Sequence, residues 1–270
     1  MIWQKLIFNI ILLIAIAYFL IGLFFYFMQK SFIYHPDEMD FESCEGFEDY
    51  EKINHNGTRF YFKKTSGENV LIYYHGNAGS ACSRSNLKHF FENCTCSLIF
   101  VEYAGYAGDE KKPSKNLILE DVKNVKNFLE SSKFKNVIVY GQSIGSGPAS
   151  YHASLGGVDS LILVSPFSSL EDVAQSKFKI YPVSLILKEN YTNVKWLSEF
   201  KGHLKIFHGD RDSVVDHKFS KKLYENINIE KKDYVLIENR GHNDIWDSEK
   251  FQKLLKRFII NKSKQIGGVK

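Results

Sequence analysis

Three polar residues that lie far apart along the chain have the types needed for nucleophilic catalysis: Ser143, Asp212 and His242. A serine hydroxyl is a poor nucleophile unless a neighbouring base removes its proton. A histidine acting as that base needs a carboxylate to fix its tautomer and to stabilise its charged form. The chain order Ser, Asp, His is one in which such triads occur. We therefore expect Ser143 to be the nucleophile, Asp212 the acid and His242 the base.

The surroundings of Ser143 are those of a strained turn between a strand and a helix. The pentapeptide from Gly141 to Gly145 fits the pattern G-x-S-x-G, with an apolar run at 137–140 before it and small residues at 147–153 after it. Such a turn brings the positions two before and two after the serine together, so both must be glycine. The pentapeptide alone is also typical of a helix-start loop with a capping serine. The strand and helix around it favour the catalytic interpretation.

The other two triad candidates also follow apolar runs that are typical of buried strands. Asp212 comes shortly after residues 204–208, and His242 comes shortly after residues 234–238. Asp210 is a second candidate for the acid, with the alternative role of shaping its own loop as an Asx-turn. Both interpretations stay open, and we favour Asp212.

The tetrahedral intermediate of acyl transfer needs backbone N–H donors, which form an oxyanion hole. We expect one donor from Ile144, directly after the nucleophile. We expect the second from the loop HGNAG at 75–79, with Asn77 first and Ala78 second. The alternative for this loop is a plain strand-to-helix turn. Its glycines, Gly76 and Gly79, leave the backbone open to a ligand.

The elements that must position these residues alternate between apolar strands and amphipathic helices. This pattern predicts an α/β fold with a mostly parallel sheet that has helices on both faces. Ligands in such sheets bind beyond the carboxyl ends of the strands, where every candidate loop lies. Asn56-Gly57 predicts a two-residue hairpin. Strands are predicted at 49–55, 58–64, 69–74, 97–102, 137–140, 160–165, 204–208 and 234–238, and helices at 83–93, 116–131, 217–226 and 247–260. The apolar face of the helix at 116–131 is expected to consist of Leu117, Leu119, Val122, Val125 and Leu129.

Residues 6–28 carry no charged side chain and form an apolar stretch. As a helix they would be about 34 Å long, enough to cross a bilayer core of about 30 Å. A cleaved signal peptide and a buried core helix are the alternatives. The stretch is too long for a signal peptide and has no small-residue cleavage site. We expect residues 1–30 to be an uncleaved single-pass anchor in membrane lipid, with Trp3, Tyr18 and Tyr26 as candidate interfacial aromatics.

The charges that flank the anchor are nearly balanced, with Lys5 on one side and Lys30 on the other. The side of the membrane therefore stays open, and we favour an extracytoplasmic domain. After the anchor we expect a lead-in at 31–44 and a catalytic domain at 45–260. The domain would carry a small lid at about 166–200, and a disordered tail would follow at 261–270.

Composition excludes several other functions. The formal net charge is +4 with interleaved signs, so no basic stripe favours nucleic acid. No phosphate loop, dinucleotide pattern or metal-binding motif occurs, so we expect no cofactor and no metal. The four cysteines are Cys44, Cys82, Cys94 and Cys96. We interpret them as buried free thiols, with a bond such as Cys82 to Cys94 forming only in an oxidising compartment.

Four blocks in order resemble those of the α/β-hydrolase superfamily: HGNAG at 75–79, GQSIG at 141–145, HGDRDSVV at 208–215 and GHND at 241–244. More narrowly, the chain is similar to single-pass, membrane-anchored serine hydrolases. The resemblance covers about residues 45–260 and implies the same nucleophile, acid and base. Ala104, Ala107 and Val215 stand where the subgroup usually has Arg, Gly and Pro.

The resemblance and the anchor together imply an ester or thioester hydrolase whose substrate is a small lipid ester or an acylated protein. Phe167, Tyr181, Leu185 and Ile186 lie in the lid segment and are candidates for an apolar acyl groove. A peptidase or acyltransferase on the same triad is one alternative. A non-catalytic membrane scaffold is another.

Overall fold

A computed structural model describes residues 2–94, 96–132 and 134–264. Within these residues eight strands form one sheet in the order β1-β2-β4-β3-β5-β6-β7-β8. β1 and β2 pair antiparallel, as do β2 and β4, and the other neighbours pair parallel. The mostly parallel sheet expected from the sequence is thus confirmed. The strands are Glu51–His55 (β1), Thr58–Lys63 (β2), Asn69–Tyr74 (β3), Ser97–Glu102 (β4), Asn136–Gln142 (β5), Ser160–Val164 (β6), His203–Gly209 (β7) and Lys232–Ile237 (β8).

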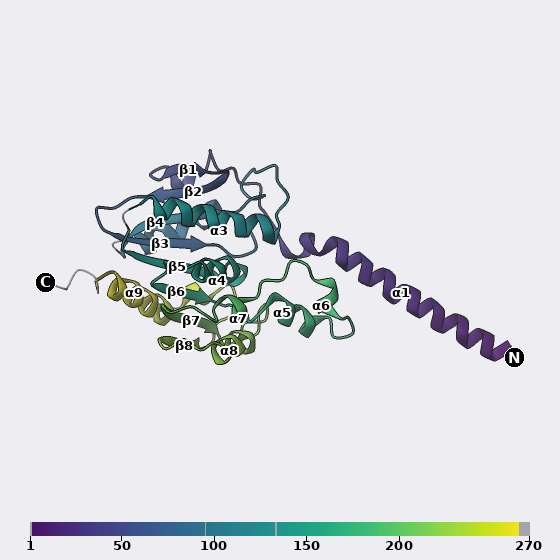
Figure 1. Ribbon diagram of the computed structural model, residues 1–270. Helices are drawn as coiled ribbons and strands as arrows, with labels where there is room; N and C mark the ends of the chain where they lie inside the picture. The colour runs from purple at the N-terminus through teal and green to yellow at the C-terminus, as the bar shows by residue number, and fades with distance from the viewer. Residues whose placement is uncertain (1, 95, 133, 265–270) are drawn as a thin grey trace.

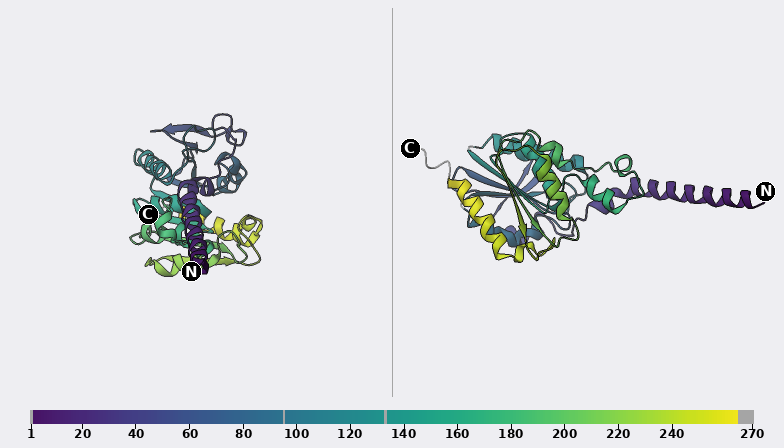
Figure 2. Two further views of the ribbon diagram at one scale, coloured as in Figure 1. Left: turned by 90° about the vertical axis from the view of Figure 1, so that its right-hand side faces the viewer. Right: turned by 90° about the horizontal axis from the view of Figure 1, so that it is seen from below.

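Helices cover both faces of the sheet, as Figures 1 and 2 show. Alternate residues of each strand serve opposite faces, so Val70 and Ile72 of β3 join one core cluster and Leu71 and Tyr73 join the other. The described helices are Ile2–Ile33 (α1), Lys88–Glu92 (α2), Lys115–Glu130 (α3), Ser146–Ser154 (α4), Leu170–Lys177 (α5), Val183–Ile186 (α6), Asn193–Trp196 (α7), His217–Asn226 (α8) and Glu249–Lys264 (α9).

Two helical predictions need correction. The helix expected at 83–93 is a 3₁₀ segment, Cys82–Leu87, followed by the short α2. The expected apolar face of α3 omitted Ile118, which is buried with Val122, Val125 and Leu129 at helical spacing. Leu117 and Leu119, which were expected on that face, are only half-buried.

Helix α1 projects from the domain, as Figure 1 shows. It is 32 residues long, and its most apolar stretch has a mean hydropathy of 2.8 with none of that stretch buried in the protein. Its length and composition suit a membrane span, and a signal sequence would pass the same test.

The lead-in at 31–44 packs against the domain. Tyr34, Phe41 and Cys44 are buried, and Cys44 forms a disulfide with Cys82. The interpretation of all four cysteines as free thiols is therefore wrong, and so is the pairing of Cys82 with Cys94. The cause is the folding of the lead-in back onto the domain, which brings the Cα atoms of Cys44 and Cys82 to 5.9 Å.

The carboxyl-terminal tail also begins later than expected. α9 continues through Lys264, so residues 261–264 are helical rather than disordered. Buried Ser263 links this last turn to the sheet, because its carbonyl accepts a hydrogen bond from Asn69 at 3.1 Å. Residues 265–270 lie outside the described part of the chain.

Candidate active site

The turn at Ser143 has the strained geometry that the sequence predicts. Ser143 follows β5 directly and has a φ of 55°, in the left-handed region that non-glycine residues rarely occupy. A Cβ on Gly141 would lie 2.4 Å from the carbonyl oxygen of Gly145. A Cβ on Gly145 would lie 2.4 Å from the carbonyl oxygens of Tyr74 and His75. Both positions therefore require glycine, and the turn holds the serine between β5 and α4.

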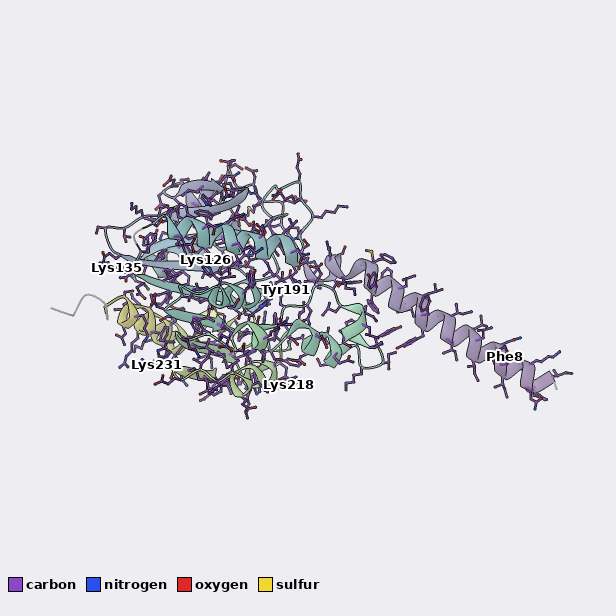
Figure 3. All side chains as sticks on the ribbon, in the orientation of Figure 1. Phe8, Lys126, Lys135, Tyr191, Lys218 and Lys231 are labelled. Atoms are coloured by element: carbon purple, nitrogen blue, oxygen red, sulfur yellow. A yellow bond between two sulfur atoms is a disulfide. The ribbon has the colours of Figure 1, made fainter. Side chains whose placement is uncertain are left out.

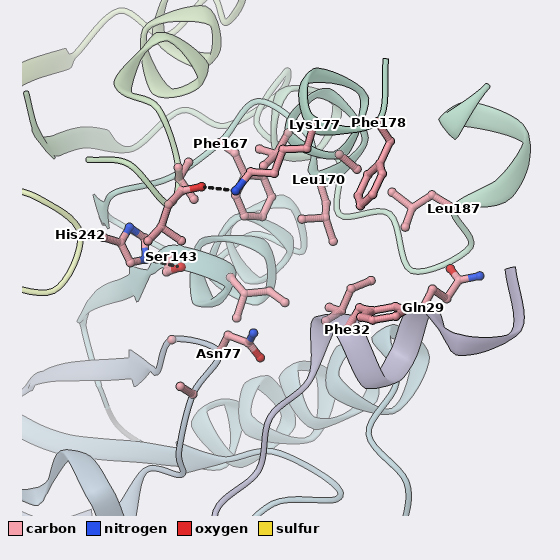
Figure 4. A pocket seen from close by; sticks show the side chains of 18 of the residues that line it. Gln29, Phe32, Asn77, Ser143, Phe167, Leu170, Lys177, Phe178, Leu187 and His242 are labelled. Carbon is pink, nitrogen blue, oxygen red and sulfur yellow. Dashed lines mark hydrogen bonds between the residues drawn. The ribbon is translucent and has the colours of Figure 1, made fainter. Parts of the chain in front are cut away.

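The structure brings Ser143, His242 and Asp212 together, although 99 residues separate the first two. The Nε2 atom of His242 lies 2.9 Å from Ser143 Oγ, and its Nδ1 atom lies 2.6 Å from Asp212 Oδ2. Figure 4 shows the histidine ring beside the serine at one end of a pocket. With the proton on Nδ1, the ring donates to the carboxylate and accepts the serine hydroxyl proton on Nε2.

Asp212 is buried and accepts hydrogen bonds on both oxygens. Its Oδ1 accepts from the backbone N–H groups of Val214 and Val215, at 2.9 and 2.8 Å. Its Oδ2 lies 3.1 Å from His208 Nε2 as well as near His242. Burial alone would raise the pKa of Asp212, but the hydrogen bonds from His208 and His242 outweigh it and hold the pKa well below its usual range. The carboxylate is therefore ionised beside the imidazole.

From the sequence alone, no role in the site is expected for His208. It is fully buried, and its Nε2–H donates to the Val215 carbonyl at 2.8 Å while also facing Asp212. The available signal was its position at the end of β7, four residues before the acid. His208 fixes the orientation of the carboxylate that faces His242.

The competing carboxylate, Asp210, has a different role. Its Oδ1 accepts from the backbone N–H of Arg240 at 3.3 Å. That bond joins the loop after β7 to the loop after β8. Asp244 shapes the second loop by accepting from the N–H of Gly241 at 2.6 Å. These two side chains position the turn that carries His242.

The loop that follows β3 lies against Ser143. A Cβ on Gly76 would be 3.7 Å from Ser143 Cβ, and Asn77 and Ala78 line the same pocket as Ser143, Ile144 and His242. Gly79 has a φ of 82°, which suits glycine, and its N–H donates to the carbonyl of His35 at 3.1 Å. The backbone of this loop therefore lies beside Ser143 in the pocket.

Several neighbours hold this loop in place. The Tyr103 hydroxyl donates to the His75 carbonyl at 2.8 Å, and the Tyr106 hydroxyl donates to the Asn77 carbonyl at 3.3 Å. From the lead-in, the N–H of His35 donates to Asn77 Oδ1 at 3.2 Å. Ala107, in the position where the resembling subgroup has glycine, adopts a φ of 45°. Sequence reasoning missed the lead-in as a support of the site, because it has no periodic pattern.

A cavity of about 520 Å³ extends from Ser143 beneath residues 166–200, the segment that is expected from the sequence to be a lid and that keeps this name here. Its walls are mostly apolar, as is usual for small-molecule sites. Phe167, Tyr181 and Ile186 line it as expected, but Leu185 does not line it and is 72% exposed. Leu170, Val173 and Phe178 of the lid complete this side.

The far wall of the cavity comes from the last turns of α1. Phe25, Gln29, Phe32 and Ile33 line it, and Figure 4 shows Gln29 and Phe32 opposite the lid. The Gln29 side chain is buried and bonds the lid backbone. Its Oε1 accepts from the N–H groups of Lys188 at 2.6 Å and Glu189 at 3.1 Å, and its Nε2 donates to the Ile186 carbonyl at 3.3 Å. The sequence offered one signal, an amide just before Lys30 at the end of an apolar stretch.

Among the described residues, no group of three or more His, Cys, Asp or Glu side chains is arranged to hold a metal ion. The geometry at Ser143 instead offers a hydroxyl, a base and a carboxylate in hydrogen-bonded order. That set can carry out acyl transfer through the serine oxygen.

No family model matches the chain. Among curated proteins, it is 26% identical to human alpha/beta hydrolase domain-containing protein 17B over 197 residues, 70% of this chain and 66% of that one. It is 25% identical to an uncharacterized protein of Mycobacterium tuberculosis over 207 residues, 74% of this chain and 73% of that one.

Solved structures with the same fold include the esterase Pf2001 of Pyrococcus furiosus, with a TM-score of 0.68 at 14% identity. That match covers 85% of this chain and 98% of the esterase. A monoacylglycerol lipase of Paleococcus ferrophilus matches with a TM-score of 0.60 at 12% identity, covering 76% of this chain and 99% of the lipase. The fold of the chain is therefore the α/β-hydrolase fold.

Proposed function

We propose that the chain is a member of the α/β-hydrolase superfamily, and that it is a membrane-anchored serine hydrolase that cleaves carboxylic ester or thioester bonds. The observation that carries the proposal is the continuous hydrogen-bonded series from Ser143 through His242 to Asp212, with distances of 2.9 and 2.6 Å. In this proposal Ser143 is the nucleophile, His242 the general base and Asp212 the acid.

The first half of the reaction forms an acyl-enzyme. His242 Nε2 takes the hydroxyl proton as Ser143 Oγ attacks the carbonyl carbon, and the carbonyl electron pair moves onto oxygen. Collapse of this intermediate breaks the bond to the leaving oxygen or sulfur, which takes the proton from Nε2. Water then attacks the acyl-enzyme by the same steps, releases the acid and restores the serine hydroxyl.

The charged intermediate needs two backbone donors, and we assign them to Ile144 and Asn77, with Ala78 as the alternative to Asn77. Ile144 lies directly after the nucleophile, in the 3₁₀ turn Ser143–Gly145 that leads into α4. The bonds of Tyr103 and Tyr106 to the carbonyls of His75 and Asn77 support preorganised donors there, because they fix the orientation of the peptide groups in the loop after β3.

We assign the cavity to the acyl part of the substrate. Its apolar walls suit a hydrocarbon chain, and the contribution of α1 to the far wall suits a substrate drawn from a membrane. Lipid esters, lysophospholipids and thioesters of acylated proteins share this acyl chemistry.

We propose that α1 is a single-pass anchor and that the domain faces an oxidising compartment. Retention of α1 is supported by its bonds to the lid through Gln29, since a cleaved leader would leave the lid backbone unpaired. The extracytoplasmic side is supported by the disulfide between Cys44 and Cys82, because such bonds persist outside the reducing cytosol.

The test uses the full chain in detergent micelles with a fluorophosphonate probe and p-nitrophenyl esters. We expect the wild type to be labelled at Ser143 and to hydrolyse the esters, and Ser143→Ala to lose both. Ser165→Ala is a matched control, because Ser165 is a buried serine that also has a positive φ, at 48°. A folded wild type that is not labelled by the probe and does not hydrolyse the esters would support a non-catalytic membrane scaffold instead.

Two further assays separate the alternative reactions on the same triad. Added acceptor alcohols would be acylated by an acyltransferase, and peptide amides would be cleaved by a peptidase. For the proposed hydrolase we expect release of free acid to exceed both reactions.

A further inference from the structure

The lid presents large apolar side chains to the outside of the protein. Ile180 and Leu185 are 74% and 72% exposed, and Phe178 is 41% exposed. Ile180 and Leu185 lie outside the cavity, so they neither fill the core nor line the candidate site. Exposed apolar side chains gathered on one short segment are typical of an interaction surface.

Contacts with α1 fix the level of this segment along the helix. The Tyr18 hydroxyl donates to the carbonyl of Ile180 at 2.7 Å, and the rings of Tyr18 and Tyr181 stack with centroids 4.6 Å apart. Two turns after Tyr18, the ring of Phe25 packs against the ring of Phe178, with centroids 5.0 Å apart. The lid therefore lies beside the second half of α1 rather than beyond its end.

The length of α1 then sets the depth of the lid. A bilayer core of about 30 Å takes about 20 helical residues at 1.5 Å each. If those residues begin directly after Lys5, they end at Phe25, and Tyr18 lies about 10 Å inside the core boundary. If they begin at Ile2, Tyr18 still lies about 5 Å inside it. Either placement puts Ile180 within the leaflet.

The lid backbone is suited to this depth, because polar groups in hydrocarbon need internal partners. Gln175 donates to the carbonyls of Phe178 and Tyr181 and accepts from the N–H of Val183. Tyr18 and Gln29 satisfy the carbonyls of Ile180 and Ile186. Side chains therefore pair backbone groups that water would pair in an ordinary surface loop.

The charges of the segment also suit a membrane boundary. Residues 177–188 contain three lysines and no acidic residue. Lys179 is exposed next to Ile180, and Lys188 lies 5.6 Å from the ring of Tyr26. Long lysine side chains reach headgroups while their stems stay in apolar surroundings.

We propose that residues 178–187 of the lid insert into the membrane leaflet beside α1. The partner is the lipid bilayer itself, and acyl chains enter the cavity sideways from that leaflet. The inference rests on the proposed anchor and hydrolase activity, and it adds a membrane-embedded rim to the substrate pocket.

The first experiment measures depth. The full chain, confirmed by mass to retain residues 1–33, is reconstituted in phosphatidylcholine vesicles, with an environment-sensitive fluorophore on a cysteine introduced by Ile180→Cys. Lipids brominated along the acyl chains should quench this label strongly. A label from Lys231→Cys, at the end of the domain opposite to α1 in Figure 3, should not be quenched. Cys94 and Cys96 are buried, and the parent protein gives the background labelling.

The second experiment measures function with the double variant Ile180→Ser, Leu185→Ser. We expect hydrolysis of a long-chain ester in vesicles to fall by about tenfold or more, because two exposed apolar side chains no longer enter the leaflet. Hydrolysis of soluble p-nitrophenyl acetate should be unchanged. Met39→Ser, which removes a 48% exposed side chain from the lead-in, should change neither.

The outcomes separate the two proposals. If the wild type does not hydrolyse p-nitrophenyl acetate, the proposed hydrolase activity is contradicted. Acetate hydrolysis without quenching at position 180 contradicts insertion of the lid and leaves the hydrolase standing. A double variant that fails to fold loses acetate turnover too, and the quenching measurement then decides.

Discussion

The two ends of the cavity are built in different ways. At the Ser143 end, strand-end loops converge and backbone atoms approach so closely that Gly141 and Gly145 have no room for a Cβ. At the other end, the lid meets α1 through side chains whose residues lie more than 150 positions apart, such as Gln29 with Lys188. The first end depends on local turn geometry, and the second depends on the pairing of two distant segments.

Under the proposed function, this difference separates the groups that carry out the chemistry from the groups that select the substrate. Changes at the Ser143 end should reduce turnover of every ester, because they alter the reacting groups. Changes at the α1 end should affect long acyl chains and spare short ones, because a short chain does not reach the far wall.

The largest effect is expected from Asp212→Asn. The amide would favour the wrong tautomer of His242, and kcat should fall by about 10³- to 10⁴-fold for short and long esters alike. Asp210→Asn is the matched control and should retain turnover within a few-fold, since the amide oxygen of Asn can still accept from Arg240 N–H. A larger loss in Asp210→Asn would reverse the assignment, and equal losses would show that the loop, rather than the acid, matters. Steady-state kinetics on p-nitrophenyl esters make the measurement.

A smaller loss is expected from His208→Leu, which removes a donor to the Asp212 carboxylate. Losing a hydrogen bond to a charged group should lower kcat by about 10- to 100-fold with little change in KM. The pKa of Asp212 should rise, so activity should begin to fall at a higher pH on the acid side. His208→Gln keeps an N–H donor and should recover part of kcat and of the pH profile. A pH profile that does not move would mean that His208 is only a packing residue.

Gln29→Leu tests the other end of the cavity. It leaves the N–H groups of Lys188 and Glu189 and the carbonyl of Ile186 without this partner. We expect the lid to loosen, with faster tryptic cleavage after Lys177 or Lys188 and about 3- to 10-fold slower hydrolysis of long-chain esters.

Hydrolysis of p-nitrophenyl acetate by Gln29→Leu should be unchanged within twofold. Gln252→Leu is the control, because Gln252 is an exposed glutamine that also donates to a backbone carbonyl, that of Trp246. Equal loss on short and long esters would remove the distinction between the two ends.

The smallest effect on turnover is expected at Asp121, which lies outside both ends. Burial raises its pKa to about 7, although it accepts from Ala104 N–H and the Thr58 hydroxyl. The folded state therefore binds a proton more tightly than the unfolded state. Protonation of Asp121 therefore stabilises the folded state fully below about pH 4. This contribution to the free energy of unfolding, at most about 4 kcal/mol, is lost as the pH rises through 7.

Urea unfolding between pH 4 and 8 checks this expectation. The stability of the wild type should fall across that range relative to Asp121→Asn, while kcat at pH 8 stays within twofold in the variant. An identical pH slope for both proteins would show that Asp121 is not protonated in the folded state.

The parts that could be predicted from the sequence are those set by local patterns. The bounds of β3 and β4 match their apolar runs, and the Asn56-Gly57 hairpin has positive φ at both residues. The Ser143 turn followed from glycine spacing. In each case neighbouring residues alone decide the outcome.

The remaining features depend on contacts that no local pattern reports. The disulfide partner of Cys82 is Cys44, because an aperiodic lead-in folds back onto the domain. His208 and Gln29 have nothing unusual in their sequence neighbours, and their roles come from the carboxylate and the lid backbone that they meet. Leu185 resembles a pocket residue in the sequence, but α6 turns it outward.

The contribution of α1 to the pocket has a practical consequence for anyone preparing a soluble fragment. A protein that starts at Tyr34 would retain every group at the serine end but would lack Phe25, Gln29 and Phe32. Its pocket would open to solvent along one side, and Ile186 and Lys188 would lose their partners. Inhibitors screened against such a fragment would be selected for binding to an open groove, whereas the full chain has a cavity with a wall from α1.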